Sequence, residues 1–303
     1  MMGWKSGLSL AVILPLLALA AIYSYDRLGT FNFFLPKDAG SQRVAENIGY
    51  GEGARRSLDV YAPIKPGKNL PVIVFFYGGS WNSGYRQGYA FVGRALAAQG
   101  FVVIVPDYRI APEVRYPDFL RDCADAVRWT RAHVAQYGGD STRIVLAGHS
   151  AGAYNAAEIA LDPQWLGADG VSIKGVIGLA GPYDFLPLDV PSTKAAFGLW
   201  PNLADTQPIT HVRAEAPPML LLHGANDTLV RQRNSISLNA KLNAAGGKST
   251  LKIYPNTDHI EIVTALAVPF RGTAPVLVDM AAFAHKVTAT APFDRVNGHS
   301  EPL

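Results

Sequence analysis

The chain has 303 residues, of which 49% are hydrophobic and 17% are charged, and its net charge is +3. This composition excludes a disordered chain and predicts an ordered protein with material for one large α/β domain or two small domains. The arginines form no run and Cys123 is the only cysteine, so we exclude nucleic-acid binding, a disulfide framework and a thiolate metal site.

The first 25 residues differ from the rest, because residues 8–25 contain no charged side chain. As a helix, these 18 residues would reach about 27 Å, close to the hydrocarbon thickness of a lipid bilayer. We expect residues 1–25 to be an uncleaved membrane anchor or a signal peptide cleaved after Ala20, with a buried cytosolic helix as a third option. The anchor would place the folded body of the chain on the extracytoplasmic side, beyond a juxtamembrane linker at residues 26–42. Cleavage would instead export this body to the periplasm.

The body of the chain alternates strands with helices. Apolar and β-branched runs predict strands over residues 43–50, 57–62, 70–76, 101–105, 143–147, 175–179, 219–223 and 251–254. Helices are predicted over residues 88–99, 118–137, 153–161, 230–245 and 275–289. Repeated β-α units indicate a mostly parallel, doubly wound sheet with helices on both faces, in a domain over residues 43–290 that is followed by a tail over 291–303. Active sites on such sheets lie beyond the carboxyl ends of the strands.

The sequence Gly-His-Ser-Ala-Gly at residues 148–152 lies between a predicted strand and a predicted helix. It fits the pattern G-x-S-x-G, in which the serine sits on a strained turn with its oxygen lifted above the sheet. The same short pattern also occurs in turns without chemistry. Ser150 is therefore a candidate nucleophile whose role depends on the other motifs.

A second motif, Tyr-Gly-Gly-Ser-Trp at residues 77–81, directly follows the strand predicted at 70–76. Paired glycines at the carboxyl end of a strand let backbone N–H groups turn toward a ligand at close range. Together with the N–H of Ala151, such groups would hold the oxyanion of a tetrahedral intermediate. A plain turn is the alternative interpretation.

Asp227 and His259 lie in loops that follow two later strands. A carboxylate in such a loop can orient an imidazole, and the pKa of histidine is close to working pH. Asp227 is equally well placed to cap the helix predicted from residue 230. The chain order Ser150, Asp227, His259 is the order of the α/β-hydrolases. We expect structural roles for His149 and His223.

Over residues 43–289 the chain resembles the α/β-hydrolase esterases, particularly the branch related to bacterial feruloyl and acetyl-xylan esterases and to kynurenine formamidases. The resemblance rests on YGGSW at 77–81, DYRIAPE at 107–113, GHSAG at 148–152, HGAND at 223–227 and DHI at 258–260. It implies an α/β-hydrolase fold, a catalytic triad and an oxyanion hole. The implied triad is Ser150, His259 and Asp227, and the implied oxyanion donors are Gly79, Ser80 and Ala151.

Two positions depart from the family pattern. Many relatives have His-Gly-Gly where this chain has Tyr77 before its two glycines, a change that leaves the oxyanion backbone intact. Members similar to hormone-sensitive lipase have Asp where this chain has His149, which argues against that branch.

The resemblance implies a serine carboxylic ester hydrolase for small-molecule esters with small or medium acyl groups, which needs no metal and no organic cofactor. Two alternatives stay open, an amidase or peptidase on the same triad and a catalytically silent, membrane-tethered binding module. Residues 181–218 are proline-rich and aromatic and predict a small cap over Ser150, although satellite packing explains them equally well. The candidate substrate-pocket residues are Trp81, Tyr183 and Phe185.

Overall fold

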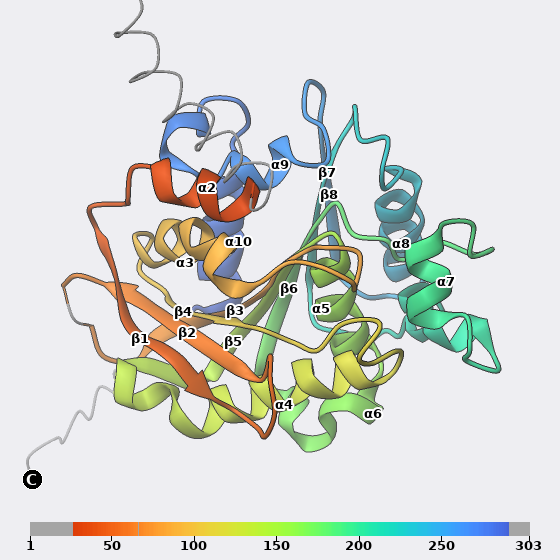
Figure 1. Ribbon diagram of the computed structural model, residues 1–303, viewed down its shortest axis with the longest axis horizontal. Helices are drawn as coiled ribbons and strands as arrows, with labels where there is room; N and C mark the ends of the chain where they lie inside the picture. Colours follow the sequence, from red (N-terminus) through yellow and green to blue (C-terminus); the bar gives the residue numbers. More distant parts are fainter. Residues whose placement is uncertain (1–26, 66, 291–303) are drawn as a thin grey trace, which may run out of the picture.

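A mixed eight-stranded sheet runs through the computed structural model, which describes residues 27–65 and 67–290 (Figure 1). Its strand order is β1-β2-β4-β3-β5-β6-β7-β8, and the pairings of β2 with β1 and with β4 are antiparallel. The remaining pairings are parallel. The strands are β1 (Ser41–Gly49), β2 (Ser57–Pro63), β3 (Leu70–Phe76), β4 (Val102–Pro106), β5 (Gly139–His149), β6 (Ile173–Leu179), β7 (Met219–Gly224) and β8 (Ser249–Tyr254).

Helices cover both faces of this sheet. The α-helices are α2 (Arg27–Phe34), α3 (Ala90–Ala97), α4 (Asp118–His133), α5 (Ala151–Leu161), α6 (Pro163–Leu166), α7 (Pro191–Phe197), α8 (Arg233–Ala244), α9 (Glu261–Thr264) and α10 (Val276–Thr288). Helices α3 and α10 pack together on one face, and α4, α5 and α8 lie on the other (Figure 1). The prediction of a mostly parallel, doubly wound sheet is therefore confirmed.

The central strands of the sheet are built mainly from apolar residues. Strand β3 is apolar throughout and its last six residues are buried, because helices cover both of its faces. Strand β5 begins four residues before its predicted start at residue 143. Polar residues at 140–142 conceal this extension in the sequence, and Asp140 accepts hydrogen bonds from the backbone and side chain of Thr142.

The segment before β1 is more ordered than the predicted linker over residues 26–42. Helix α2 occupies its first part, and β1 already begins at Ser41. Phe31 packs against Phe91 and Phe270, with ring centroids 5.6 and 6.0 Å apart, whereas Phe33 is 78% exposed. The apolar segment at residues 8–25 and the tail at 291–303 lie outside the described residues. Within 27–65 and 67–290, no helix combines the length and apolar character needed to span a membrane.

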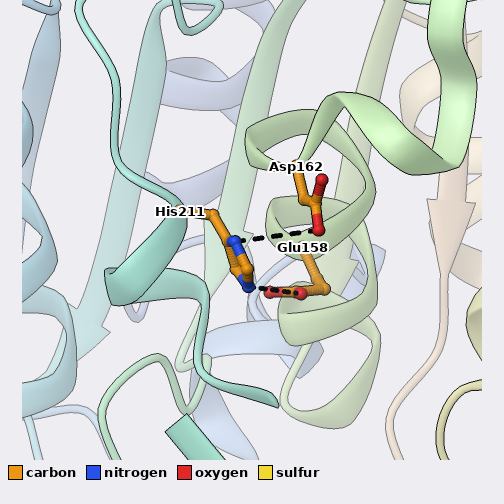
Figure 2. Close-up of side chains that lie close together, drawn as sticks. All are labelled: Glu158, Asp162 and His211. Atoms are coloured by element: carbon orange, nitrogen blue, oxygen red, sulfur yellow. Dashed lines mark ion pairs between the residues drawn. The ribbon is translucent and has the colours of Figure 1, made fainter. Parts of the chain in front are cut away.

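Residues 181–218 fold as α7 and two short 3₁₀ helices, η4 (Leu203–Thr206) and η5 (Pro208–His211). Helix η5 contacts both α5 and α8. The Tyr154 hydroxyl on α5 donates to the carbonyl of Thr206 (2.8 Å), and His211 faces Glu158 and Asp162 at the far end of α5 (Figure 2). The segment is thus fixed to α5, the helix that directly follows Ser150.

Candidate active site

Ser150 lies on the turn between β5 and α5 with φ 55° and ψ −123°, a conformation that residues other than glycine rarely adopt. The flanking glycines are sterically required. A Cβ on Gly148 would lie 2.2 Å from the carbonyl oxygen of Gly152, and a Cβ on Gly152 would lie 2.0 Å from that of Phe76. The Ser150 N–H donates to the Leu179 carbonyl on β6 (2.8 Å). These contacts hold the serine at the carboxyl end of the sheet.

Loops from two other strands bring a histidine and a carboxylate to this serine. His259 follows β8, and its Nε2 lies 2.9 Å from Ser150 Oγ. Asp227 follows β7, and its Oδ2 lies 2.7 Å from His259 Nδ1. All three side chains are buried. The structure therefore brings together in one hydrogen-bonded line the three residues that the sequence nominated.

The Asp227 carboxylate is held by four donors. Its Oδ1 accepts from the backbone N–H groups of Leu229 (2.9 Å) and Val230 (2.8 Å), and its Oδ2 faces His259 Nδ1 and, at 3.3 Å, His223 Nε2. Burial alone would raise the pKa of Asp227, but the hydrogen bonds from His223 and His259 outweigh it and hold the pKa well below its usual range. The carboxylate is therefore charged at neutral pH.

His223 fulfils its predicted structural role. It is fully buried, its Nε2 lies 2.7 Å from the Val230 carbonyl and its Nδ1 lies 2.8 Å from Ser235 Oγ. Helix α8 begins at Arg233, three residues later than predicted. The backbone donors to Asp227 therefore belong to a turn before the helix, and the interpretation of Asp227 as the cap of a helix from residue 230 is wrong.

Asp258 adjoins His259 in sequence but turns away from it. Its Oδ1 accepts from the backbone N–H groups of Ile260 and Glu261, both at 2.8 Å, and its side chain is exposed. These bonds hold the turn that leads into α9. Asp258 therefore shapes the loop that carries the histidine without contacting the imidazole.

His149 connects two parts of the site. Its Nε2 lies 2.8 Å from the carbonyl oxygen of His259, and its Nδ1 lies 3.3 Å from the Tyr89 hydroxyl, which accepts from the Gly78 N–H. Burial, with the neighbouring His259 next, lowers the pKa of His149 to about 3, so the ring is neutral. A neutral ring that donates from Nε2 fixes the backbone of the loop that carries His259.

The 77–81 loop faces the serine from the neighbouring strand β3. Gly79, Ser80 and Trp81 all have positive φ values, of 135°, 51° and 58°. Ser80 and Ala151 line the same cleft as Ser150, whereas Gly79 is not among the residues that line it. Ala151 is the first residue of α5, where backbone N–H groups lack an intrahelical partner. The backbone N–H groups of Ser80 and Ala151 are thus the candidate oxyanion donors that border the cleft.

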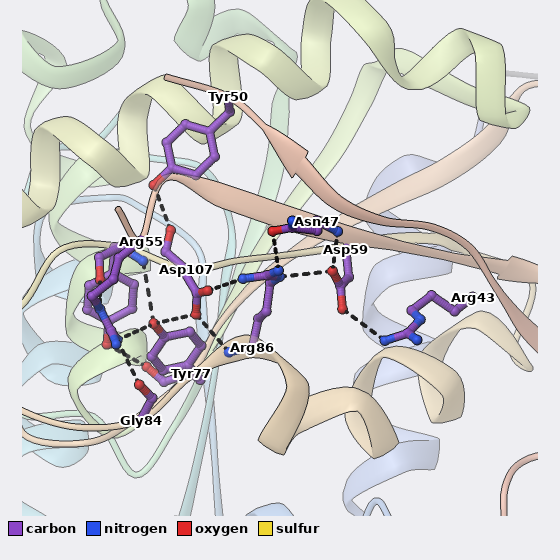
Figure 3. Close-up of polar contacts among 10 residues, drawn as sticks. Arg43, Asn47, Tyr50, Arg55, Asp59, Tyr77, Gly84, Arg86 and Asp107 are labelled. Carbon is purple, nitrogen blue, oxygen red and sulfur yellow. Dashed lines mark hydrogen bonds and ion pairs between the residues drawn. The ribbon is translucent and has the colours of Figure 1, made fainter. Parts of the chain in front are cut away.

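A buried polar network anchors the base of this loop (Figure 3). The Tyr77 hydroxyl donates to Asp107 Oδ1 (2.9 Å) and accepts from Arg55 Nη2 (2.9 Å), and Asp107 also accepts from the backbone N–H of Arg86 (2.8 Å). The Arg86 guanidinium pairs with both Asp107 and Asp59. The Tyr77 hydroxyl therefore completes a network that holds the base of the loop.

Sequence reasoning did not assign these network residues a role. Asp107 belongs to the DYRIAPE motif, which supports only the family resemblance. Arg55 and Arg86 lie outside the predicted strands and helices, in stretches with no distinguishing pattern. Their pairing across distant segments becomes visible only in the fold.

A cleft of about 440 Å³ opens above Ser150. Trp81 and Phe185 line it, with Pro187 and Val190 from the 181–218 segment and Leu229 from the loop after β7. The predicted cap segment therefore supplies one wall. Tyr183 does not line the cleft, because its side chain is fully buried and its hydroxyl points at the backbone of β6. Its assignment as a pocket residue is therefore wrong.

Comparison with known proteins places this site in a family. The BD-FAE family model matches residues 58–242. The chain is 30% identical over 300 residues to a protein of Oryza sativa subsp. japonica named "Probable isoprenylcysteine alpha-carbonyl methylesterase", covering 91% of this chain and 70% of that protein. It is 35% identical over 219 residues to esterase LipC of Mycobacterium tuberculosis, covering 64% of this chain but only 54% of that esterase.

Solved structures confirm the fold. Esterase B from Lactobacillus rhamnosis superposes with a TM-score of 0.75 at 20% identity, covering 90% of this chain and 95% of that one. A truncated carbohydrate esterase from gut microbiota gives a TM-score of 0.73 at 22% identity, covering 84% and 100%. With the family match, these findings show that the chain belongs to the BD-FAE family of α/β-hydrolases and is a carboxylic ester hydrolase.

Proposed function

We propose that the protein hydrolyses small or medium acyl esters through an acyl-enzyme on Ser150. The observation that carries this proposal is the line of hydrogen bonds from Ser150 Oγ to His259 Nε2 and from His259 Nδ1 to Asp227 Oδ2. The line ends at a cleft that is open to substrate. Because Ser150, His259 and Asp227 are hydrogen-bonded as a serine hydrolase requires, these contacts argue against the alternative of a catalytically silent binding module.

The roles follow from the donors and acceptors. Asp227 is charged and accepts the Nδ1 proton of His259, so Nε2 is the basic nitrogen that takes the Ser150 proton during attack on the ester carbonyl. The N–H groups of Ser80 and Ala151 receive the negative charge that develops on the carbonyl oxygen. The His259 imidazolium then protonates the leaving alcohol, and an incoming water releases the acyl group by the same steps in reverse.

The cleft supports the proposed substrate size. Its volume of about 440 Å³ is at the small end of the range for ligand pockets. Trp81 and Phe185 stack with ring centroids 6.0 Å apart and give it an apolar wall. A short or medium acyl chain can lie against this wall, while the alcohol leaves toward solvent.

A methyl ester of a larger apolar group is a second candidate substrate. It is suggested by the relatives named as isoprenylcysteine alpha-carbonyl methylesterases. Leu229 and Val190 line the cleft and are 73% and 45% exposed, so they offer an apolar surface that continues outside it. Such a substrate would place its small alcohol inside and its apolar group along this surface.

A substrate panel separates these possibilities. The full chain, purified in a non-ionic detergent, is assayed against nitrophenyl acetate, butyrate and decanoate, a prenylcysteine methyl ester and matched nitroanilides. We expect the highest kcat/KM on acetate or butyrate, and background rates for Ser150→Ala. Preference for the methyl ester would favour the second candidate, and preference for the anilides would favour an amidase. Near-normal turnover in Ser150→Ala would contradict the mechanism.

A further inference from the structure

Two arginines line the cleft above Ser150 and have no role in the mechanism proposed above. Arg231 lies in the loop after β7, and Arg233 is the first residue of α8. Both border the cleft that is also lined by Ser150 and His259, and both border a neighbouring hollow of about 520 Å³. A substrate that extends from the ester in this direction therefore meets two guanidinium groups.

The backbone that carries these arginines is held at both ends. At its beginning, two backbone N–H groups of the loop donate to Oδ1 of Asp227. At its end, the buried side chain of Asn234 donates to the Arg231 carbonyl (3.1 Å). The Asn234 Oδ1 also accepts from the backbone N–H groups of Tyr183 and Asp184, both at 2.9 Å. The loop is thus tied to the triad and to the segment that supplies the other wall of the cleft.

The protein does not neutralise either guanidinium group. Both arginines are exposed, and neither side chain makes a hydrogen bond or an ion pair within residues 27–65 and 67–290. By contrast, Arg86 and Arg109 each pair with a carboxylate. Arg233 also begins a helix whose first turn contains no acidic residue. A cation there is unfavourable, because the free backbone N–H groups already make the start of a helix partly positive.

Two carboxylates border the same space, and neither offsets both arginines. Asp189 lines the cleft from the facing segment, is exposed and pairs with neither arginine. Asp227 borders the hollow, but its side chain has no exposed surface and its oxygens face four donors of the loop and of the two histidines. The cleft lining therefore has two guanidinium groups against one exposed carboxylate, an excess of positive charge.

We propose that Arg231 and Arg233 bind a carboxylate carried by the substrate, so that the protein prefers esters with a second, negatively charged group. This inference rests on the proposed ester hydrolysis at Ser150. Guanidinium groups bind carboxylates through paired N–H donors, and their charge also draws anions toward the cleft. The carboxylate belongs either to the acyl chain, as in a half-ester of a dicarboxylic acid, or to the alcohol, as in an ester of a hydroxy acid.

Matched substrates test this preference. The full chain in a non-ionic detergent is assayed, by titration of the released acid, on monomethyl adipate, methyl ω-hydroxyhexanoate and methyl ω-aminohexanoate, whose acyl chains end in a negative, a neutral and a positive group. A second pair, butyryloxyacetate and hydroxyethyl butyrate, places the negative charge on the alcohol instead. In one of these series, kcat/KM for the anionic ester should exceed that for the neutral ester by about tenfold, mainly through a lower KM. Sodium chloride at about 1 M should remove most of the preference.

Arginine variants assign the preference to its residues. Arg231→Gln and Arg233→Gln should each lower the ratio of anionic to neutral kcat/KM by about three- to fivefold, and the double variant should bring this ratio close to one. Arg115→Gln is the matched control, because Arg115 is also exposed, has no ion pair in the described part of the chain and does not line the cleft. Its ratio should equal that of the wild type. The ratio compares two substrates on one sample, so a partly misfolded variant still reports.

Binding to Ser150→Ala separates this proposal from the proposed function. In calorimetric titrations, this variant should bind the preferred anionic ester about tenfold more tightly than its neutral counterpart. Turnover that depends on Ser150 but favours neither anionic ester would overturn the carboxylate site and leave the proposed function standing. A preference that persists in the double arginine variant would overturn it as well. Selective binding of the anionic ester without turnover that depends on Ser150 would support the site and refute the acyl-enzyme.

Discussion

Replacing Asp227 by asparagine tests the electrostatic core of the site. The side-chain oxygen of the introduced asparagine can still accept from the backbone N–H groups of Leu229 and Val230, so the loop should keep its shape. Its amide nitrogen would then face His259 Nδ1 and donate to it. The imidazole proton must move to Nε2, which can no longer accept the Ser150 proton. We expect kcat to fall by about 10⁴, a barrier increase of about 5.4 kcal/mol, with little change in KM.

The matched control is Asp258→Asn, one residue from the histidine. Asp258 is exposed, and its Oδ1 accepts from the backbone N–H groups of Ile260 and Glu261, which the side-chain oxygen of asparagine can also do. Its kcat should stay within about tenfold of the wild type, a change of at most about 1.4 kcal/mol. The assay is steady-state hydrolysis of nitrophenyl butyrate, with melting curves to verify folding. If the two variants exchange these behaviours, the assignment of Asp227 is refuted.

Three further predictions concern the network, the elbow histidine and the amino terminus. Tyr77→Phe leaves Asp107 without one donor and should lower the free energy of unfolding by about 1–3 kcal/mol in urea titrations, and an unchanged midpoint would contradict this. His149 has a lowered pKa, so folding stability should fall as pH decreases from about 6.5 toward 3, by up to about 1.4 kcal/mol per pH unit. His149→Gln should flatten that slope, and an identical slope would refute the assignment. Mass spectrometry of the native protein should find residues 8–25 retained in the membrane fraction, whereas a mature chain starting near residue 21 would rule out the anchor.

The strands and the triad were predictable because their signals are local. Strand β3 is one unbroken apolar run, and Ser150 sits in a motif whose glycines are sterically required. Asp227 and His259 follow strands whose carboxyl ends must meet at one edge of a parallel sheet. Chain order then sufficed to nominate the three residues.

What the sequence concealed depends on contacts between distant segments. Arg55 and Asp107 both reach the Tyr77 hydroxyl only because β2 pairs with β4 and the loops beyond them converge on Tyr77. Likewise, His211 reaches Glu158 only after the 181–218 segment folds back along α5. The aromatic character of Tyr183 suggests a pocket residue. An aromatic side chain in the 181–218 segment can equally well pack into the protein core behind the cleft wall, and Tyr183 does so.

The measurement that most directly tests the catalytic account is covalent titration of the nucleophile. The full chain is treated with a nitrophenyl phosphonate, the released nitrophenol is counted, and the modified peptide is sequenced by mass spectrometry. We predict release of about one nitrophenol per chain, loss of esterase activity in proportion to labelling, and the phosphonyl group on Ser150, which lies 2.9 Å from His259 Nε2. Label on another residue, or inactivation of Ser150→Ala at the wild-type rate, would contradict it.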